Sequence, residues 1–220
     1  PRPIVEIAKK MRAMPSGQVL ELWATDHVAL NDVPAWCHKT GNTLVSHEQE
    51  GAVLKFFVQK APVEKVQMAG KLSLVLSTDH LDKVCSAFTI ANAAAASDME
   101  VSILFTCWGV NLVKRRGARP RGRGLLARLM NLFSPRGPDR LPVSRFNFCG
   151  LGSWMMRQRM KAEGIQSVPE LMADARELGV RFLVCDNPLS IVGLRREDLV
   201  DEVDAVIGAA SYIQEASGAE

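Results

Sequence analysis

The sequence lacks the cysteine patterns that would assign it to a metal-binding or disulfide-stabilised class. Its five cysteines are scattered, with no C-x-x-C pair and no Cys/His cluster at metal-ligand spacing, and they lie at Cys37, Cys85, Cys107, Cys149 and Cys185. We therefore expect no zinc site and no disulfide framework. Scattered free thiols are typical of a reducing compartment, so we expect a cytoplasmic protein.

Long apolar runs and nucleotide-binding glycine motifs are also missing. The most apolar stretch, Val84–Val113, is interrupted by polar residues near Asp98, so it does not predict a membrane-spanning helix. No G-x-G-x-x-G follows an expected strand, and we expect no bound flavin or other cofactor. The chain begins at Pro1 without a Met, which we interpret as the start of a processed or excised piece.

Positive charge is concentrated in one segment although the net charge is only +3. Basic residues crowd the stretch 114–123, and the stretch lacks the interleaved aromatics typical of RNA binding, so no nucleic-acid partner is expected. Three interpretations stay open: a solvated loop, steering of anionic substrates or acidic partners, and contact with an anionic membrane through 114–133. The third rests on an adjacent amphipathic patch at Leu125–Phe133.

The first 59 residues predict a small two-layer α+β unit whose first strand is missing. The periodicity predicts helices at Pro3–Met14 and His27–Lys39 and strands at 18–25, 42–47 and 53–59. Asp26 is a plausible cap for the second helix, in which Pro34 should lie near an end or a kink. A polar stretch, 60–70, predicts a linker.

Residues 71–220 alternate strands with helices, which predicts a parallel sheet with helices on both faces. Strands are expected at 72–76, 99–106 and 180–184, and helices at 81–96, 108–113, 154–161, 168–178 and 209–216. A basic and helical insertion, 114–142, interrupts this alternation.

Two cysteines follow strands of the expected sheet, where ligands of open α/β sheets bind. Cys185 ends the strand that begins after Gly179, and Cys107 follows the strand before it, so the two thiols could lie side by side. Cys149, beside Gly150 in the inserted segment, could face the same cleft or serve only as a small apolar residue. These three are the candidate reactive thiols.

Other polar and apolar candidates have simpler structural interpretations. Cys85 and Cys37 lie on apolar helix faces, where packing is the expected role. Asp79 or Thr78 should cap the helix after the first strand, while His80 could tune a thiol or lie on the surface. Asn187 and Pro188 predict a turn behind Cys185. Apolar residues 154–156 and Met160 are expected in the core.

The N-terminal unit resembles the TusA family of sulfur carriers. Pro1-Arg2-Pro3 matches the last three positions of the family's Cys-Pro-x-Pro motif, and further matches lie at 19–22, 24–26, 33–37 and 39–41. The resemblance implies that the motif cysteine would immediately precede Pro1.

Residues 71–217 resemble the DsrE/DsrF-like family, through Phe105-Thr-Cys-Trp-Gly109, Pro135–Pro138, Leu178–Cys185, Ile191–Leu194 and the stretches 72–78, 91–95, 111–112 and 209–212. The resemblance implies a Rossmann-like fold, homo-oligomers and the handling of sulfane sulfur as cysteine persulfides. Units of both families also occur fused to flavin-dependent disulfide reductases of the coenzyme A type, often with a rhodanese unit.

These observations predict a sulfur-relay protein in which a persulfide passes between protein thiols. Cys185 is the first candidate carrier, with Cys107 and Cys149 behind it. The resemblance implies donor and acceptor partners of the rhodanese or TusA type. The alternative is a non-catalytic oligomerisation or docking module of a flavin-dependent disulfide reductase, in which no thiol reacts.

Overall fold

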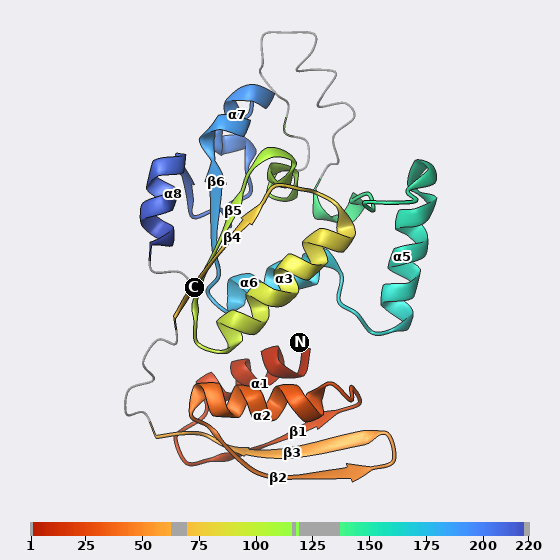
Figure 1. Cartoon of the computed structure of the whole chain (residues 1–220), viewed down its shortest axis with the longest axis vertical. Coiled ribbons are helices and arrows are strands. Elements are labelled where there is room, and N and C mark those ends of the chain that lie inside the picture. Colours follow the sequence, from red (N-terminus) through yellow and green to blue (C-terminus); the bar gives the residue numbers. More distant parts are fainter. Residues whose placement is uncertain (1, 63–69, 116–117, 119–136, 218–220) are drawn as a thin grey trace.

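The computed structural model describes residues 2–62, 70–115, 118 and 137–217 (Figure 1). The first unit contains α1 (Arg2–Ala13), β1 (Val19–Ala24), α2 (Ala29–Thr40), β2 (Thr43–Glu50) and β3 (Val53–Gln59). The second contains β4 (Lys71–Leu76), α3 (Leu81–Ala96), β5 (Glu100–Phe105), α5 (Leu151–Ala162), α6 (Val168–Glu177), β6 (Arg181–Cys185), α7 (Asp186–Val192), β7 (Ala205–Ile207) and α8 (Ala209–Ala216). Short 3-10 helices are η1 (Cys107–Leu112), η2 (Pro138–Arg140), η3 (Phe148–Gly150) and η4 (Arg196–Asp198). The predicted patch Leu125–Phe133 lies outside the described residues.

The first unit is a three-stranded antiparallel sheet in the order β1-β3-β2, covered on one face by α1 and α2 (Figure 1). Strand β3 alternates buried and half-buried residues because one face meets the helices while the other faces solvent. Its inward side chains Leu54, Phe56 and Val58 pack in one core with Ile7 of α1 and Trp36 of α2. This is the predicted two-layer α+β arrangement.

The second unit is a four-stranded parallel sheet in the order β4-β5-β6-β7. Successive side chains of a strand point to opposite faces, so Ile103 and Phe105 face α3 and α6 while Leu104 faces α8. Gly179 ends the α6 segment with φ +87°, a left-handed conformation that glycine adopts at little cost. The chain then enters β6, as the sequence predicted.

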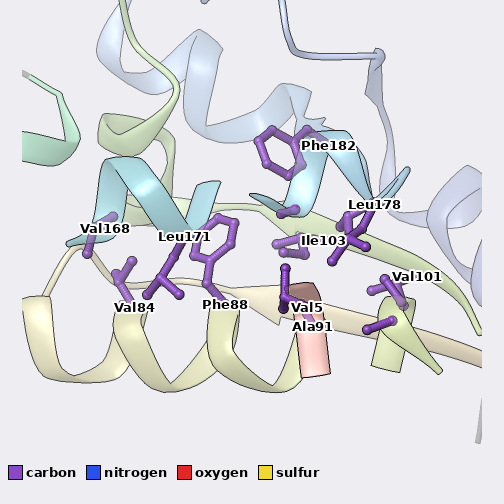
Figure 2. Close-up of a cluster of buried hydrophobic side chains, with 14 of the residues drawn as sticks. Val5, Val84, Phe88, Ala91, Val101, Ile103, Val168, Leu171, Leu178 and Phe182 are labelled. Atoms are coloured by element: carbon purple, nitrogen blue, oxygen red, sulfur yellow. The ribbon is translucent and has the colours of Figure 1, made fainter. Parts of the chain in front are cut away.

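An aromatic cluster fills the space between the sheet and its helices. The rings of Phe105 and Phe182 meet edge to face with centroids 5.3 Å apart, and Phe88 of α3 packs against Phe182 at 5.9 Å. Edge-to-face contacts suit the charge distribution of aromatic rings. Figure 2 shows Val5 of α1 beside Phe88 and Ala91, so this core also receives a side chain from the first unit.

Polar contacts join the two units along the same helices. Lys9 of α1 pairs with Asp174 and Glu177 of α6, each at 2.6 Å. Arg12 donates to the backbone oxygens of Leu178 and Ala95, and Trp36 Nε1 donates to the Ala96 oxygen at 2.6 Å. Because these donors satisfy carbonyls at helix C-termini, α1 and α2 also complete the ends of α3 and α6.

Several local predictions were wrong. Pro34 lies inside α2, which excludes the predicted place near an end, and the helix expected at 108–113 is the short 3-10 helix η1 over Cys107–Leu112. Asn187 and Pro188 belong to the first turns of α7, not to a turn. Asp26 accepts a hydrogen bond from the Val28 amide, so it caps the turn that precedes α2.

Candidate functional site

The carboxyl ends of β5 and β6 bring Cys107 and Cys185 to one edge of the sheet. Phe105 pairs with Val184 in the register, so Cys185 is one residue beyond that pair and Cys107 two residues beyond it. Backbones of neighbouring strands lie about 4.8 Å apart. The two predicted thiol positions are therefore neighbours at this edge.

Cys185 is buried, with 8% of its surface exposed. Its side chain lies on the α8 face of the sheet, in a small apolar cluster with Leu104 and Leu183, and Tyr212 of α8 packs against that cluster. Cys185 also pairs in register with Ile207 of β7 and immediately precedes α7. The thiol that the sequence placed at a cleft thus lies beneath α8.

Cys107, by contrast, is exposed. It begins η1 with φ +47°, a left-handed conformation that is uncommon outside glycine, and Thr106 Oγ1 lies 3.9 Å from its sulfur. Gly109 fixes the position of η1, since a Cβ at this residue would lie 2.0 Å from the Leu76 carbonyl oxygen. Only glycine allows η1 to approach the end of β4 so closely.

Polar residues after β4 support this same edge. Asp79 is buried and accepts a hydrogen bond from Asn111 Nδ2 at 2.8 Å, which ties the loop after β4 to η1. Thr78 Oγ1 and His80 Nδ1 are 2.7 Å apart, and the Thr78 oxygen also accepts the His80 amide. Neither Thr78 nor Asp79 caps α3, so that prediction was wrong: His80 occupies the N-cap position without a side-chain cap.

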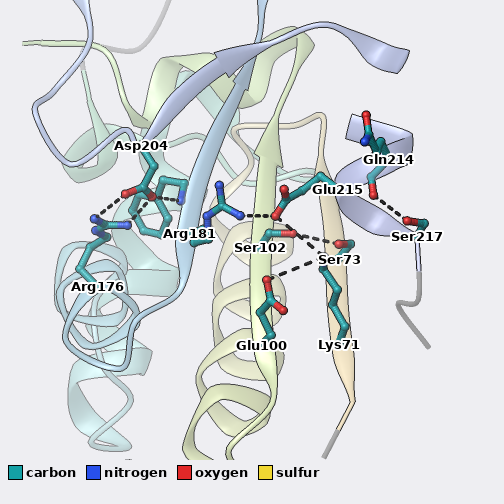
Figure 3. Close-up of polar contacts among 11 residues, drawn as sticks. Lys71, Ser73, Glu100, Ser102, Arg176, Arg181, Asp204, Gln214, Glu215 and Ser217 are labelled. Carbon is teal, nitrogen blue, oxygen red and sulfur yellow. Dashed lines mark hydrogen bonds and ion pairs between the residues drawn. The ribbon is translucent and has the colours of Figure 1, made fainter. Parts of the chain in front are cut away.

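Ion pairs hold α8 across the other end of the sheet (Figure 3). Glu215 of α8 pairs with Arg181 of β6 and lies 4.0 Å from Lys71 of β4. Beside them, the hydroxyls of Ser73 and Ser102 are 2.9 Å apart. Burial raises the pKa of Tyr212, and a hydrogen bond with Ser73 partly offsets that rise. These contacts keep α8 over the strand that carries Cys185.

The remaining cysteines lie elsewhere. Cys149 is exposed in η3 at the start of α5, which Figure 1 shows to one side of the sheet, away from the end of β6. Burial raises the pKa of Cys37 to about 11. Burial, together with the charge of Asp82, raises the pKa of Cys85 to about 11. Thiols with such pKa values form little thiolate at neutral pH, which agrees with the packing roles expected for both.

A cleft of about 460 Å³ opens between α5 and the start of α6. It is lined by Leu81, Pro138, Asp139, Arg157, Met160, Lys161 and residues 164–170, none of them a cysteine. Among the described residues, no group of three or more His, Cys, Asp or Glu side chains could hold a metal ion. No helix in the described part of the chain is long and apolar enough to cross a bilayer.

Three residues that shape the site carried no role in the sequence analysis: Gly109, Asn111 and Tyr212. All three belong to stretches that carry the family resemblance, so the motif was the available signal. Their contacts, with Leu76, Asp79 and the Cys185 cluster, join segments far apart in the chain, and no local pattern reveals such pairs.

Family models match both units of the chain. The model for the DsrE/DsrF/DrsH-like family matches residues 68–220, and the model for the sulfurtransferase TusA matches residues 1–60. The uncharacterized protein YrkE of Bacillus subtilis is 34% identical over 146 residues, which cover 66% of this chain and 91% of YrkE. The sulfur carrier protein DsrE2 of Allochromatium vinosum is 26% identical over 151 residues, with the same coverage of both chains. The putative sulfur carrier protein YrkI of Bacillus subtilis is 47% identical over 60 residues, or 27% of this chain and 80% of YrkI.

A parallel sheet with thiols at its carboxyl edge, preceded by an antiparallel carrier-like unit, defines a two-unit protein of the sulfur-relay type. The chain belongs to the DsrE/DsrF/DrsH-like family and carries a TusA-like unit at its N-terminal end.

Proposed function

We propose that this protein carries sulfane sulfur as a persulfide on Cys185 and passes it between partner thiols. The observation that carries the proposal is the place of Cys185, at the carboxyl end of a central parallel strand in a chain of this family. Relatives of both units are named sulfur carrier proteins, which supports the same role.

The transfer step is a thiol exchange. The Cys185 thiolate attacks the outer sulfur of a donor persulfide, a new S–S bond forms, and the donor's S–S bond breaks. The electron pair leaves with the donor's inner sulfur, so one thiolate enters and one thiolate leaves. An acceptor thiolate then attacks the outer sulfur on Cys185 in the same way. The exchange consumes no oxidant, reductant, metal or cofactor.

Access governs this step, because a partner's thiolate must reach a sulfur that is 8% exposed. Tyr212 covers the Cys185 cluster, so α8 must shift before a partner can react. Cys107 is already exposed at the same edge and can receive sulfur from Cys185 or deliver it there, while Cys149 is a separate exposed thiol. Burial of Cys185 would then protect a bound persulfide from small reductants.

The partners that fit are proteins with a reactive cysteine, of the rhodanese or TusA type. A cytoplasmic location fits this proposal, because a relay by free thiols requires a reducing compartment. A homo-oligomeric state completes the proposal. The TusA-like unit of this chain is held against α3 and α6 through Lys9, Arg12 and Trp36. The TusA-like unit therefore stays beside the DsrE-like domain while external partners exchange sulfur with Cys185.

Mass spectrometry after incubation with a sulfane-sulfur donor tests the proposal. We expect one added sulfur on Cys185, loss of that adduct in Cys185→Ser, and retention in the control Cys37→Ala. Full labelling of Cys185→Ser at another cysteine would contradict the assignment.

The docking-module alternative has a different test. If all five cysteines could be replaced without changing the turnover of a flavin-dependent disulfide reductase to which the chain is joined, the docking-module alternative would hold.

A further inference from the structure

The outer face of α5 is apolar and exposed, although the sequence predicted Trp154 and Met155 in the core. Met160, on the inner side of the helix, packs against the core as predicted. Leu151, Trp154 and Met155 expose 55%, 58% and 56% of their surfaces, and the preceding Phe146 and Phe148 expose 76% and 70%. The rings of Phe146 and Phe148 stack with centroids 6.2 Å apart. A continuous run of large apolar side chains on a surface marks a site of interaction.

Helix geometry places these side chains on one side of α5. With about 100° per residue, Leu151, Trp154 and Met155 share a face, and Ser153 and Met160 point the opposite way. Ser153 is buried, accepts the Val143 amide at 3.1 Å and donates to Asn147 at 2.7 Å. The helix is thus held to the protein along its polar inner side.

Two further contacts fix α5 in this orientation. Arg157 donates to the Leu141 oxygen at 2.9 Å. A Cβ at Gly152 would lie 2.1 Å from the Phe146 oxygen, so the start of the helix packs tightly against the segment that carries the phenylalanines. The apolar face is therefore directed outward by close packing and is not a consequence of a loosely attached helix.

Positive charge flanks the apolar face. Helix α5 contains three basic residues and no acidic one. Arg159 and Lys161 lie on either side of the apolar face, and both are exposed, as is Arg145 beside Phe146. Arg159 pairs with Glu163 just beyond the helix, at 2.6 Å and with both side chains exposed, where solvent screens the pair.

We propose that this face, formed by Phe146, Phe148 and the outer side of α5, binds the headgroup region of an anionic lipid bilayer. Aromatic and aliphatic side chains on one face with basic residues at its borders are the composition of helices that lie in the membrane interface. The helix projects from the side of the domain (Figure 1). Exposed apolar side chains on such a helix can insert into fluid lipid without a matching pocket. The cations favour anionic headgroups. The proposal does not depend on the persulfide role of Cys185, although the exposed Cys149 lies within this surface.

Vesicle binding by the whole chain tests this inference. We expect co-flotation with phosphatidylcholine vesicles that contain phosphatidylglycerol, and binding to phosphatidylcholine alone that is at least about tenfold weaker. Trp154→Glu should weaken binding to the anionic vesicles by at least about tenfold. The matched control is Ile213→Glu, which changes an even more exposed apolar residue on α8 and should bind as the unaltered chain does. Circular dichroism of each variant checks that the fold is kept.

A separate variant tests whether binding to anionic vesicles requires the basic residues. Arg159→Gln with Lys161→Gln should reduce binding to anionic vesicles while leaving the apolar face intact. Unchanged binding in Trp154→Glu would overturn the inference, as would equal binding to neutral vesicles. Light scattering that shows a dimer dissociated by Trp154→Glu, without vesicle binding, would assign the face to a second copy instead.

Discussion

The Nζ atom of Lys9 lies 2.6 Å from Oδ1 of Asp174 and joins α1 of the TusA-like unit to α6 of the DsrE-like domain. Burial acts to lower the pKa of Lys9, but the hydrogen bonds and charges of Asp174 and Glu177 outweigh it, so the pKa is raised. The contribution of Lys9 is therefore fully present below its ordinary value of 10.5 and is lost as pH rises through the raised pKa. At neutral pH Lys9 therefore stays protonated and keeps its pairs with Asp174 and Glu177.

A double-mutant cycle measures this coupling between the units. We expect Lys9→Met and Asp174→Asn to show an interaction energy of about 1 kcal/mol in chemical unfolding, because both side chains are largely shielded from solvent. The control cycle, on the exposed pair Arg159 and Glu163, should give only about 0.3 kcal/mol. A Lys9–Asp174 coupling no larger than that of the control would show that the pair does not hold the units together.

Gly109 should be intolerant of a side chain. Gly109→Ala places a Cβ against the Leu76 carbonyl, and we expect a loss of about 2–3 kcal/mol in the free energy of unfolding. Gly208→Ala is the matched control, since a Cβ there meets nothing within 4 Å, and it should change stability by less than about 0.5 kcal/mol. Equal stability of the two variants would mean that η1 does not pack on β4 as described.

The five thiols should react with iodoacetamide in a fixed order at pH 8. Cys107 and Cys149 are exposed and should be alkylated first, and Cys185 should follow slowly because of its burial. Cys37 and Cys85 should be slowest, since burial raises the pKa of each to about 11 and little thiolate is present. Peptide mapping over time gives each rate. Alkylation of Cys185 as fast as that of Cys107 would contradict its placement beneath α8.

Tyr212 should control access to Cys185. Tyr212→Ala removes the ring that packs on the Cys185 cluster. If this lowers the free energy of the local opening that exposes Cys185 by about 1.4 kcal/mol, alkylation of Cys185 should be roughly tenfold faster. Tyr212→Phe keeps the ring and loses only the hydroxyl, so its rate should stay close to that of the unaltered chain. The rate at Cys107 serves as an internal reference. An unchanged Cys185 rate in Tyr212→Ala would exclude α8 as its cover.

Asp204 should make the domain sensitive to acid. Burial acts to raise its pKa, but hydrogen bonds from Arg176 and the Phe182 amide outweigh it, and the pKa of Asp204 is lowered below 3.8. The stability it contributes is therefore present above the ordinary carboxyl pKa and is lost as pH falls through the lowered value. Asp204→Asn should lower the melting temperature at pH 7, and the difference in melting temperature from the unaltered chain should narrow as the pH falls below 3.8. A gap that does not depend on pH would refute this.

Much of the fold could be predicted because local pattern decides it. Strand β6 is a short apolar run preceded by a glycine that must adopt a left-handed conformation, and both features can be seen in Gly179–Cys185. The period of apolar residues likewise predicted α1, α3 and the β2–β3 hairpin. Asp79 was misplaced because a tertiary contact overrides local preference: it accepts a hydrogen bond from Asn111 instead of capping a helix.

Position along a strand and exposure in space are separate properties, and the candidate site depends on both. The residue pattern alone was enough to predict that Cys185 ends a buried strand and that Cys107 follows the neighbouring strand, since alternation of strands and helices implies a parallel sheet. The burial of Cys185 and the exposure of Cys107 could be known only from the folded chain, because α8 returns across one face of the sheet from the far end of the sequence. The tertiary structure also turned the apolar side of α5 outward, since Ser153 and Gly152 bind the other side to residues that no helical periodicity can identify.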